Sequence, residues 1–229
     1  MTQIKATLID HCGSDLTTVN AARVSFGKQS TPVKWDCYEY ESGGASGDFI
    51  AVLKEGDVKL IKYLAKHKHL SPFGHAFASF HVKAPIFVAR QLVKHKFLRW
   101  NEISRRYVDD DPEFYLPDVW RGRSADKKQG SEGEVNPEYN PQYLDGKIKA
   151  AYLQALDMGI APEQARMLLP QSTMTEFYWS GSLDAFASMC RLRCASDTQY
   201  ESRIVADQIS KVMGELFPVS WKALMESED

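Results

Sequence analysis

Hydrophobic and polar positions follow two periods along the chain, one typical of strands and one typical of helices. Residues 1–10 alternate between apolar and polar types, and residues 76–82 place large apolar side chains at 77, 80 and 82. Both segments are predicted as strands, because successive strand side chains point to opposite faces. Residues 57–66 instead carry apolar side chains at 58, 60, 61, 64 and 65, a spacing that predicts a helix.

Further helices are delimited by residues that favour helix ends. Pro85 and Pro162 suit the first position of a helix, Gly159 suits the position after the last turn, and Ser182 and Asp197 resemble N-caps. The helices expected from these signals cover residues 15–23, 85–93, 142–158, 162–169, 182–194 and 197–217.

The mixture of strands and helices predicts an α/β chain without an internal repeat or a clear domain boundary, so we expect one domain over residues 1–229. Residues 27–56 and 118–141 are rich in glycine, proline and charge and are expected to be long loops or insertions. No apolar run approaches the roughly 18 residues of a membrane span. The first ten residues lack the features of a signal peptide, so we expect a cytoplasmic protein without a membrane partner.

Charge changes this picture at one place. The chain has a net charge of −2 and a pI of about 6.3, yet residues 90–107 hold six Lys or Arg, one His and a single acid, Glu102. Like charges this close repel one another unless water or an anion faces them. On the helix opened by Pro85, we expect Gln91 and His95 to share one face, and Arg90 and Lys94 to share another.

Three interpretations of this basic segment remain open: a solvated helix face, a nucleic-acid-binding strip, and a phosphate site for a small molecule. The neutral Gln91, Asn101 and Ser104 are interleaved with the cations. They favour a nucleotide site, which needs phosphate donors beside neutral groups that recognise a base. A non-specific strip needs mostly charge and stacking.

Metal binding is the weaker hypothesis for the remaining polar residues. Five of the six histidines lie between residues 67 and 95, but no H-E-x-x-H or C-x-x-C motif accompanies them. The four cysteines are Cys12, Cys37, Cys190 and Cys194, which we expect to be free thiols in a reducing compartment. We therefore expect no metal site.

Two arginines lie beside apolar positions. In a helix over 183–194, Phe186, Met189, Cys190 and Arg193 follow the spacing i, i+3, i+4, i+7, which turns Arg193 toward the apolar face. A guanidinium on an inward face must be paired or must hold a ligand. Arg166 adjoins the apolar run 167–169 and is open to the same two interpretations.

The basic segment resembles the signature of the flavin-dependent thymidylate synthases, the ThyX family, which reads R-H-R-x-x-S-x-N-E-x-S-x-R. It matches here as Lys94-His95-Lys96-x-x-Arg99-x-Asn101-Glu102-x-Ser104-x-Arg106. The segments on either side of this signature also match the family pattern, in the same order, over nearly the whole chain except much of 27–56. They comprise Ala22–Phe26, Ser71–Phe73 with His75, Phe80–Gln91, Phe114–Tyr115 with Pro117, Lys128–Ser131, Ala165–Arg166 with Leu169–Pro170, and Phe177 with Trp179 and Leu192–Arg193.

The chain also departs from the family pattern. Lys94 and Lys96 replace arginines, which keeps the charge but loses the bidentate fork, and Arg99 replaces a serine. Gly74 stands where an acid is common, and Ala195 and Asp197 replace an Asp and a His. These departures would fit a divergent member such as a viral one, which would act in the host cytoplasm.

The resemblance implies a fold and a reaction. The fold would be α/β, or α+β, with a central, mostly antiparallel sheet flanked by helices, in a homotetramer whose active sites are shared between subunits. The enzyme would reduce FAD with NADPH and methylate dUMP to dTMP, with methylenetetrahydrofolate as carbon donor. No protein nucleophile is required, in agreement with the absence of a Pro-Cys-His context around any cysteine.

The resemblance also implies site residues, position by position. FAD would be contacted by Ser71, Lys94, His95, Lys96, Glu102, Ser182 and Ser188. The nucleotide dUMP would be held by Gln91, Lys94, Glu102, Ser104, Arg105, Arg106, Arg166 and Arg193. Arg193 would be the catalytic residue, because a cation at the N3/O4 edge of uracil raises the electron density of carbon 5.

Three rivals to this interpretation remain. A nucleic-acid-binding module using residues 90–106 would bind with a steep salt dependence and without flavin. A flavin- and folate-dependent methylase could act on another uracil, such as one in RNA. A family member could also bind FAD but have lost turnover through the substitutions at Lys94, Lys96 and Arg99.

Overall fold

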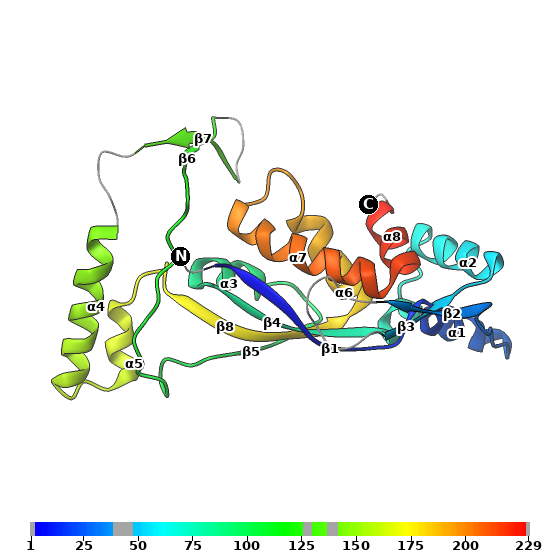
Figure 1. Cartoon of the computed structure of the whole chain (residues 1–229), viewed down its shortest axis with the longest axis horizontal. Coiled ribbons are helices and arrows are strands. Elements are labelled where there is room, and N and C mark those ends of the chain that lie inside the picture. The colour runs from blue at the N-terminus through cyan, green and yellow to red at the C-terminus, as the bar shows by residue number, and fades with distance from the viewer. Residues whose placement is uncertain (1–2, 39–47, 126–129, 137–141, 228–229) are drawn as a thin grey trace.

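A four-stranded antiparallel sheet, in the order β1-β4-β8-β5, runs through the molecule and carries helices on one face (Figure 1). The structure is a computed structural model that describes residues 3–38, 48–125, 130–136 and 142–227. The strands are β1 (Lys5–Cys12), β2 (Lys34–Tyr38), β3 (Asp48–Val52), β4 (Phe77–Pro85), β5 (Leu98–Glu102), β6 (Trp120–Arg123), β7 (Ser131–Val135) and β8 (Met174–Ser182). The α-helices are α1 (Asp15–Arg23), α2 (Glu55–Lys66), α3 (Ile86–Leu92), α4 (Gln142–Asp157), α5 (Pro162–Ala165), α6 (Leu183–Arg193), α7 (Tyr200–Leu216) and α8 (Pro218–Glu226). Short 3-10 turns are η1 (Val24–Phe26), η2 (Ser71–His75) and η3 (Arg166–Leu168).

The core lies between this sheet and the helices α6 and α7. Every second residue of β4 is buried, from Ala78 to Ala84, while the residues between them are only partly covered. Phe186 of α6 packs edge-on against Phe80 and Trp179 of the sheet, at 5.3 Å and 5.8 Å between ring centroids. The alternation is that of an antiparallel sheet with one face on the core.

The opposite face of the sheet is polar. His81 and Lys83 of β4 both meet Glu176 of β8, at 3.0 Å and 3.5 Å. Lys83 also pairs with Glu113 at 2.8 Å, and this contact is the main cause that raises the pKa of Lys83 above its ordinary value. The single covered face therefore fixes the register of the sheet.

Strand β5 approaches β8 closely. Trp100 stacks on Phe177 with 3.6 Å between ring centroids, and a side chain at Gly181 would collide with the Leu98 side chain. The glycine is thus required for the pairing of β5 with β8. This pairing carries the basic segment along the edge of the sheet from one end to the other.

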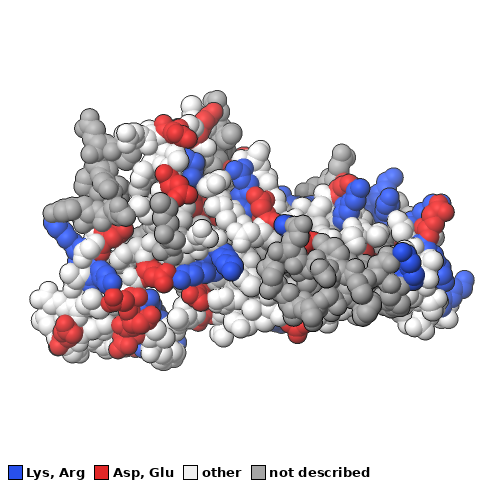
Figure 2. Space-filling view, viewed as in Figure 1, with Lys and Arg blue, Asp and Glu red and all other residues white. Residues whose placement is uncertain are grey.

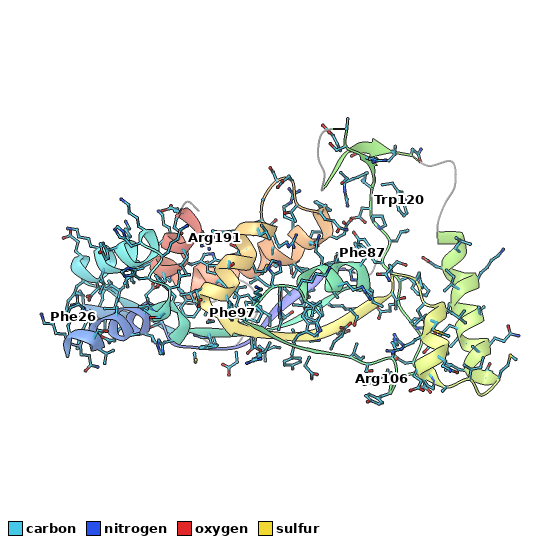
Figure 3. The ribbon with its side chains drawn as sticks, turned by 180° about the vertical axis from the view of Figure 1, so that it is seen from behind. Phe26, Phe87, Phe97, Arg106, Trp120 and Arg191 are labelled. Carbon is cyan, nitrogen blue, oxygen red and sulfur yellow. The ribbon has the colours of Figure 1, made fainter. Side chains whose placement is uncertain are left out.

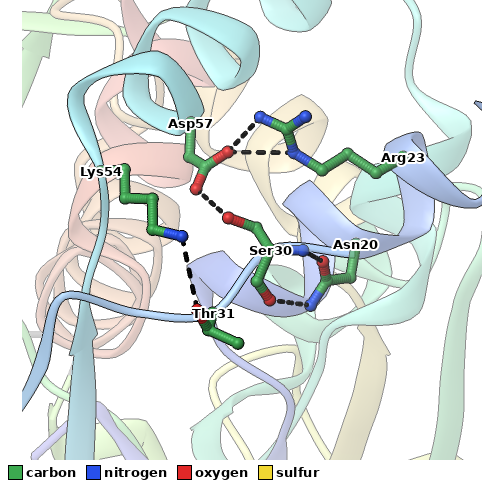
Figure 4. A network of polar contacts seen from close by, with 6 residues as sticks. All are labelled: Asn20, Arg23, Ser30, Thr31, Lys54 and Asp57. Carbon is green, nitrogen blue, oxygen red and sulfur yellow. Dashed lines mark hydrogen bonds and ion pairs between the residues drawn. The ribbon is translucent and has the colours of Figure 1, made fainter. Parts of the chain in front are cut away.

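A polar network closes the end of the molecule where α1 and α2 lie (Figure 4). Asp57 of α2 is 1% exposed and accepts hydrogen bonds from Arg23 of α1, at 3.0 Å and 2.5 Å, and from the Ser30 hydroxyl. The side-chain amide of Asn20 accepts from the Ser30 backbone N–H at 2.7 Å and donates to the Ser30 backbone oxygen at 3.1 Å. The network fixes the chain after η1, where the sequence predicted a loop.

Most helices lie where the sequence predicted them, and three boundaries were wrong. The helix expected over 162–169 ends at Ala165 and is followed by the 3-10 turn η3. The helix opened by Pro85 ends at Leu92, so Lys94 and His95 lie beyond it and share no helical face with Arg90 and Gln91. The helix expected from Asp197 begins at Tyr200 with Gln199 at its N-cap position, and it ends before Pro218, which opens the unpredicted α8. Strands β5 and β8 were not predicted either.

Each of the two segments expected to be long loops or insertions contains an antiparallel pair of strands. Within 27–56, β2 pairs with β3, and the segment ends inside α2. Within 118–141, β6 pairs with β7, and Figure 1 shows this ribbon standing apart from the sheet, above α3. Residues 39–47, 126–129 and 137–141 of these segments, including Gln129 and Lys128, lie outside the described residues.

Candidate active site

A cavity of about 990 Å³ opens between α3, the start of α7 and the β6–β7 ribbon. It is lined by Phe87, Arg90, Gln91, Lys94, Tyr115, Pro117, Val119, Trp120, Arg121, Gly130, Ser131, Gln171, Ser172, Arg193, Gln199 and Glu201. We refer to it below as the upper cavity. Figure 3 shows Phe87 and Trp120 at this side of the molecule.

Arg193 reaches the upper cavity from the last turn of α6. Phe186, Met189 and Cys190 on the same face of that helix are fully buried, so the predicted inward direction of Arg193 is confirmed. Its Nε donates a hydrogen bond to Nε2 of His95 at 2.9 Å. Among the described residues no carboxylate pairs with Arg193, which leaves its remaining donors and its charge to the cavity.

His95 is held neutral by this arrangement. Burial of the imidazole, followed by the charge of Arg193, lowers the pKa of His95 from 6.5 to about 4. Burial also lowers the pKa of Arg193. A guanidinium nevertheless keeps its charge in proteins. A neutral imidazole can accept the guanidinium hydrogen at Nε2, whereas a protonated one would repel it. Positive charge at this corner therefore comes from Arg193, Lys94 and Lys96.

The wall opposite α3 comes from residues that the sequence did not single out as site residues. Arg121 of β6 pairs with Glu201 of α7, donates to the Ser131 hydroxyl at 2.9 Å, and lies over the Tyr200 ring at 4.5 Å. Burial, followed by the charge of Glu201, raises the pKa of Tyr115 in this wall to about 12. In the sequence, only the match of the segments around Tyr115 and Ser131 to the family pattern indicated that this wall belongs to the site.

A second cavity of about 480 Å³ lies at the far end of β5. We refer to it as the lower cavity. Its lining brings together five of the predicted site residues, Glu102, Ser104, Arg105, Arg106 and Arg166. Figure 3 places Arg106 beside α5, away from Phe87 and Trp120.

The polar groups of the lower cavity are partly fixed by their neighbours. Arg106 donates to the Ser104 hydroxyl through its backbone N–H and its Nε, each at 3.3 Å. Glu102 accepts from Thr175 at 2.6 Å and from Trp100 at 3.2 Å, so its carboxylate is oriented by the sheet. Three arginines and a hydroxyl around one cavity suit a phosphate group.

Arg105 and Arg166 are anchored differently. Arg105 donates from Nη1 to the backbone oxygen of Asp110 at 2.6 Å and to its carboxylate at 3.1 Å, so its charge is paired within its own loop. Arg166 donates only its Nε to the Glu163 backbone oxygen, at 3.2 Å, and is exposed. Arg166 is thus the freer of the two to hold an anion.

Of the residues assigned to FAD, Glu102 lines the lower cavity at the end of β5, and the other six lie around α6 and the loop before β5. The turn η2, which begins at Ser71, packs against α6, and the backbone of Leu183 bonds to Ala76 at 2.9 Å. Ser71, Ser188, Lys94 and Lys96 are exposed, and among the described residues neither lysine has an acidic partner. Ser182 donates its hydroxyl to Asp184 at 2.6 Å and can therefore only accept from a ligand. Exposed hydroxyls beside two free cations fit an anionic dinucleotide.

One chain does not bring all the nucleotide residues into one place. Gln91, Lys94 and Arg193 line the upper cavity, whereas Ser104, Arg106 and Arg166 line the lower one, and the two linings share no residue. The five residues of β5, at about 3.3 Å each, separate the two sets along the chain. Even the neighbours Ile86 and Phe87 face different cavities.

The described part of the chain offers neither a clustered set of metal ligands nor a membrane-spanning helix. No group of three or more His, Cys, Asp or Glu side chains is placed to hold a metal ion. No helix in that part is both long enough and apolar enough to cross a membrane.

Comparison with known proteins places the chain among relatives over nearly its whole length. The family model described as thymidylate synthase complementing protein matches residues 7–219. A flavin-dependent thymidylate synthase of Thermus thermophilus is 37% identical over 222 residues, covering 96% of this chain and 74% of the relative. That of Kosmotoga olearia is 36% identical over 224 residues, covering 95% and 88%.

Solved structures of similar fold include the UMP/dUMP methylase PolB from Streptomyces cacaoi. Its structure with 5-Br UMP matches with a TM-score of 0.77 and 29% identity, covering 98% of this chain and 95% of that one. Its structure with 5-Br dUMP matches with a TM-score of 0.76 and 28% identity, covering 99% and 96%.

Proposed function

The chain belongs to the family of flavin-dependent thymidylate synthases, and we propose that its reaction, the methylation of dUMP to dTMP, uses FAD, NADPH and methylenetetrahydrofolate. The methylene carbon would be transferred to carbon 5 of uracil, and tetrahydrofolate would be released. When bound, FAD would take up hydride from NADPH and supply it for the reduction of the transferred carbon.

The observation that carries this proposal is the guanidinium of Arg193. It is a partly buried cation that faces a cavity, and its Nε is bonded to a neutral imidazole rather than to an acid. Such a group can stabilise negative charge on the N3/O4 edge of uracil, which makes carbon 5 more nucleophilic. In a pocket with little water the effect is larger than in solution.

The three cysteines whose side chains the structure describes support a route without a protein nucleophile. Cys190 is buried, and burial raises the pKa of its thiol well above the ordinary value, which disfavours the reactive thiolate. Cys12 and Cys194 line neither the upper nor the lower cavity. Activation of uracil through Arg193 then replaces covalent attack on the ring.

Binding of FAD would use the surface around α6. Ser71, Ser188, Lys94 and Lys96 would face its phosphates and hydroxyls, and His95 and Ser182 would lie at the same corner. Lys94 adjoins both this surface and the upper cavity, where the uracil would lie against Arg193. The proximity of the two sites would hold the reacting groups together, a large part of the rate.

The phosphate of dUMP would be held by Ser104, Arg106 and Arg166, with Glu102 and Arg105 beside them. Since these residues line a different cavity from Arg193 in the same chain, a complete site would combine the upper cavity of one copy with the lower cavity of another. This separation supports a homotetramer with shared active sites. The expected cytoplasmic location stays a prediction.

The nucleic-acid rival gains little from the fold. Within residues 90–106, Arg105 is paired with Asp110, and the cations at the two ends of β5 open into different cavities instead of forming one track. On the face drawn in Figure 2, basic and acidic side chains are interspersed. A continuous basic strip, which binding to a polymer requires, is not visible on that face.

The test uses the purified protein loaded with FAD. Anaerobic NADPH should bleach the flavin absorbance, and dTMP should form only when dUMP and methylenetetrahydrofolate are both present. Bleaching without dTMP would contradict the proposed reaction. A protein that binds no FAD at micromolar concentration and binds single-stranded nucleic acid instead would favour the rival module.

A further inference from the structure

We infer that Ser202 of α7 is a positioning residue that fixes the amide of Gln91, so that Gln91 and Arg193 together present only hydrogen-bond donors to the pyrimidine. Ser202 has no solvent exposure and contacts neither cavity. The inference rests on the proposed function, because it concerns the edge of the base that this function places against Arg193. It assigns the choice of uracil over cytosine to a buried hydroxyl outside the site.

The first step is the contact between the two side chains. The Ser202 hydroxyl donates to Oε1 of Gln91, across 111 residues of sequence. Among the described residues Gln91 is the single partner of that hydroxyl. If the amide were turned over, Ser202 would accept from it, and the buried hydroxyl hydrogen would have no acceptor. The observed orientation is therefore the one that satisfies both groups.

The groups that Gln91 and Arg193 leave free toward the upper cavity are hydrogen-bond donors. With Oε1 occupied, Gln91 offers the upper cavity its NH₂ group, which can only donate. Arg193 spends its Nε on His95 and keeps its other N–H groups, which also only donate. Glu201, the one acid of this lining, is engaged by Arg121 and by Gln199 at 3.4 Å.

The next step follows from the chemistry of the bases. At position 4 uracil carries a carbonyl oxygen, an acceptor, where cytosine carries an amino group, a donor. At position 4 a donor pairs with the uracil oxygen and is opposed to the cytosine amino group. At N3 uracil accepts from a donor only as the anion that Arg193 would stabilise, so the choice of base rests on position 4 and on this negative charge. Discrimination against an unpaired polar group in a closed site is strong. Loss of the Ser202 hydroxyl would let the Gln91 amide rotate and offer Oε1 to cytosine.

The experiment measures dissociation constants of dUMP and dCMP by calorimetry on FAD-loaded protein, without turnover. For Ser202→Ala we expect dUMP to bind about five-fold more weakly and the ratio of the dCMP to the dUMP dissociation constant to fall by at least that factor. The control is Ser210→Ala on the same helix, whose hydroxyl accepts from Trp221 at 3.2 Å away from both cavities. It should leave the ratio unchanged.

A second variant covers the case in which Ser202→Ala does not fold. Gln91→Glu replaces the donor NH₂ by an acceptor and should lower the same ratio further. The inference is overturned if Ser202→Ala and Gln91→Glu keep the wild-type ratio while the wild-type protein makes dTMP. A wild-type protein that neither binds dUMP nor makes dTMP would overturn the proposed function as well.

Discussion

The pair of Arg193 and His95 links the two halves of the proposed chemistry at the scale of single residues. The arginine faces the cavity for the base, and the histidine belongs to the loop whose lysines would face FAD. Because no acid neutralises the guanidinium among the described residues, its charge is available to the uracil ring. Its neighbour must then be neutral, which the lowered pKa of His95 provides.

This leads to a prediction about pH. The pKa of His95 is about 4 in the folded protein against 6.5 as an ordinary value, so the unfolded chain takes up the proton first as the pH falls. The stability that neutral His95 contributes should be complete above about pH 6.5 and decline toward pH 4. Urea unfolding of wild type and His95→Gln should therefore show a difference that shrinks between pH 7 and pH 4.5. A difference that grows in this range would contradict the assignment.

A second residue prediction concerns the lower cavity. Arg106→Ala should weaken dUMP binding by about ten-fold or more, since a charge-assisted hydrogen bond to phosphate is lost, while FAD binding changes little. Calorimetry with each ligand separates the two effects. Ser104→Ala should act in the same direction but less strongly. Equal losses for dUMP and FAD would mean that these residues are structural.

Residue types could be assigned from sequence where one segment supplies them, and not where contacts cross the chain. The inward direction of Arg193 followed from the spacing of Phe186 and Cys190 on one helix. Its contact with His95 spans 98 residues, and that of Ser202 with Gln91 spans 111. No local periodicity encodes such pairs, so both appear only in the folded chain.

At the scale of elements, the β6–β7 ribbon is the part of the site that depends most on a few contacts. It stands apart from the sheet in Figure 1 and is joined to α7 through Arg121, Glu201 and the ring of Tyr200. Glu201 is 5% exposed, so its carboxylate needs that partner. The ribbon thereby forms one wall of the upper cavity.

Glu201→Gln should accordingly loosen this wall. We expect a loss of about 1–3 kcal/mol in the free energy of unfolding, because a buried charge-assisted contact is broken. Amide hydrogen exchange should speed up in residues 120–123 and 131–135 more than in the central sheet. Lys59→Ala, which removes an exposed pair with Glu55, is the control and should cost less than about 0.5 kcal/mol. Unchanged exchange in the ribbon would contradict the role of Glu201.

The elements found and missed differ in how they are stabilised. Helices such as α4 and α6 carry their own apolar face and end at glycine or at a capping residue, so their positions could be predicted. Strand β5 could not, because three of its five residues are Arg99, Asn101 and Glu102. It exists through Trp100 stacking on Phe177 and through the space left by Gly181, both supplied by β8.

At the scale of the whole molecule, the two cavities are the main result. The residues proposed to bind dUMP are divided between them, and we propose that a complete site takes one cavity from each of two chains. Sequence resemblance alone implied shared sites, and the division of the residues gives this expectation a physical reason. In a two-fold interface, residue i of one copy contacts residue j of the other, and the reverse. The upper cavity of one copy can therefore lie against the lower cavity of its partner.

Mixing two inactive variants tests this arrangement. Arg193→Ala damages only the upper cavity and Arg166→Ala only the lower one. If subunits exchange at random in an equal mixture, about a quarter of the sites should combine two intact cavities and recover activity. Mixing each variant with itself is the control. A mixture as inactive as its components, although exchange is verified by mass spectrometry, would mean that each chain builds its own site.

Arg193 is proposed to activate dUMP in a flavin-dependent methylation without a protein nucleophile. This role of Arg193 is tested in a single anaerobic turnover. Reduced, FAD-loaded protein is mixed with dUMP and methylenetetrahydrofolate, and the dTMP formed per active site is measured. Wild type should form dTMP. The control variant Arg191→Ala, which loses only a hydrogen bond from Arg191 to the Leu224 backbone oxygen at 2.8 Å, should form it too. Arg193→Ala should bind FAD but form dTMP about a hundred- to a thousand-fold more slowly. Turnover by Arg193→Ala at a near-normal rate would contradict the role of Arg193 in activating dUMP.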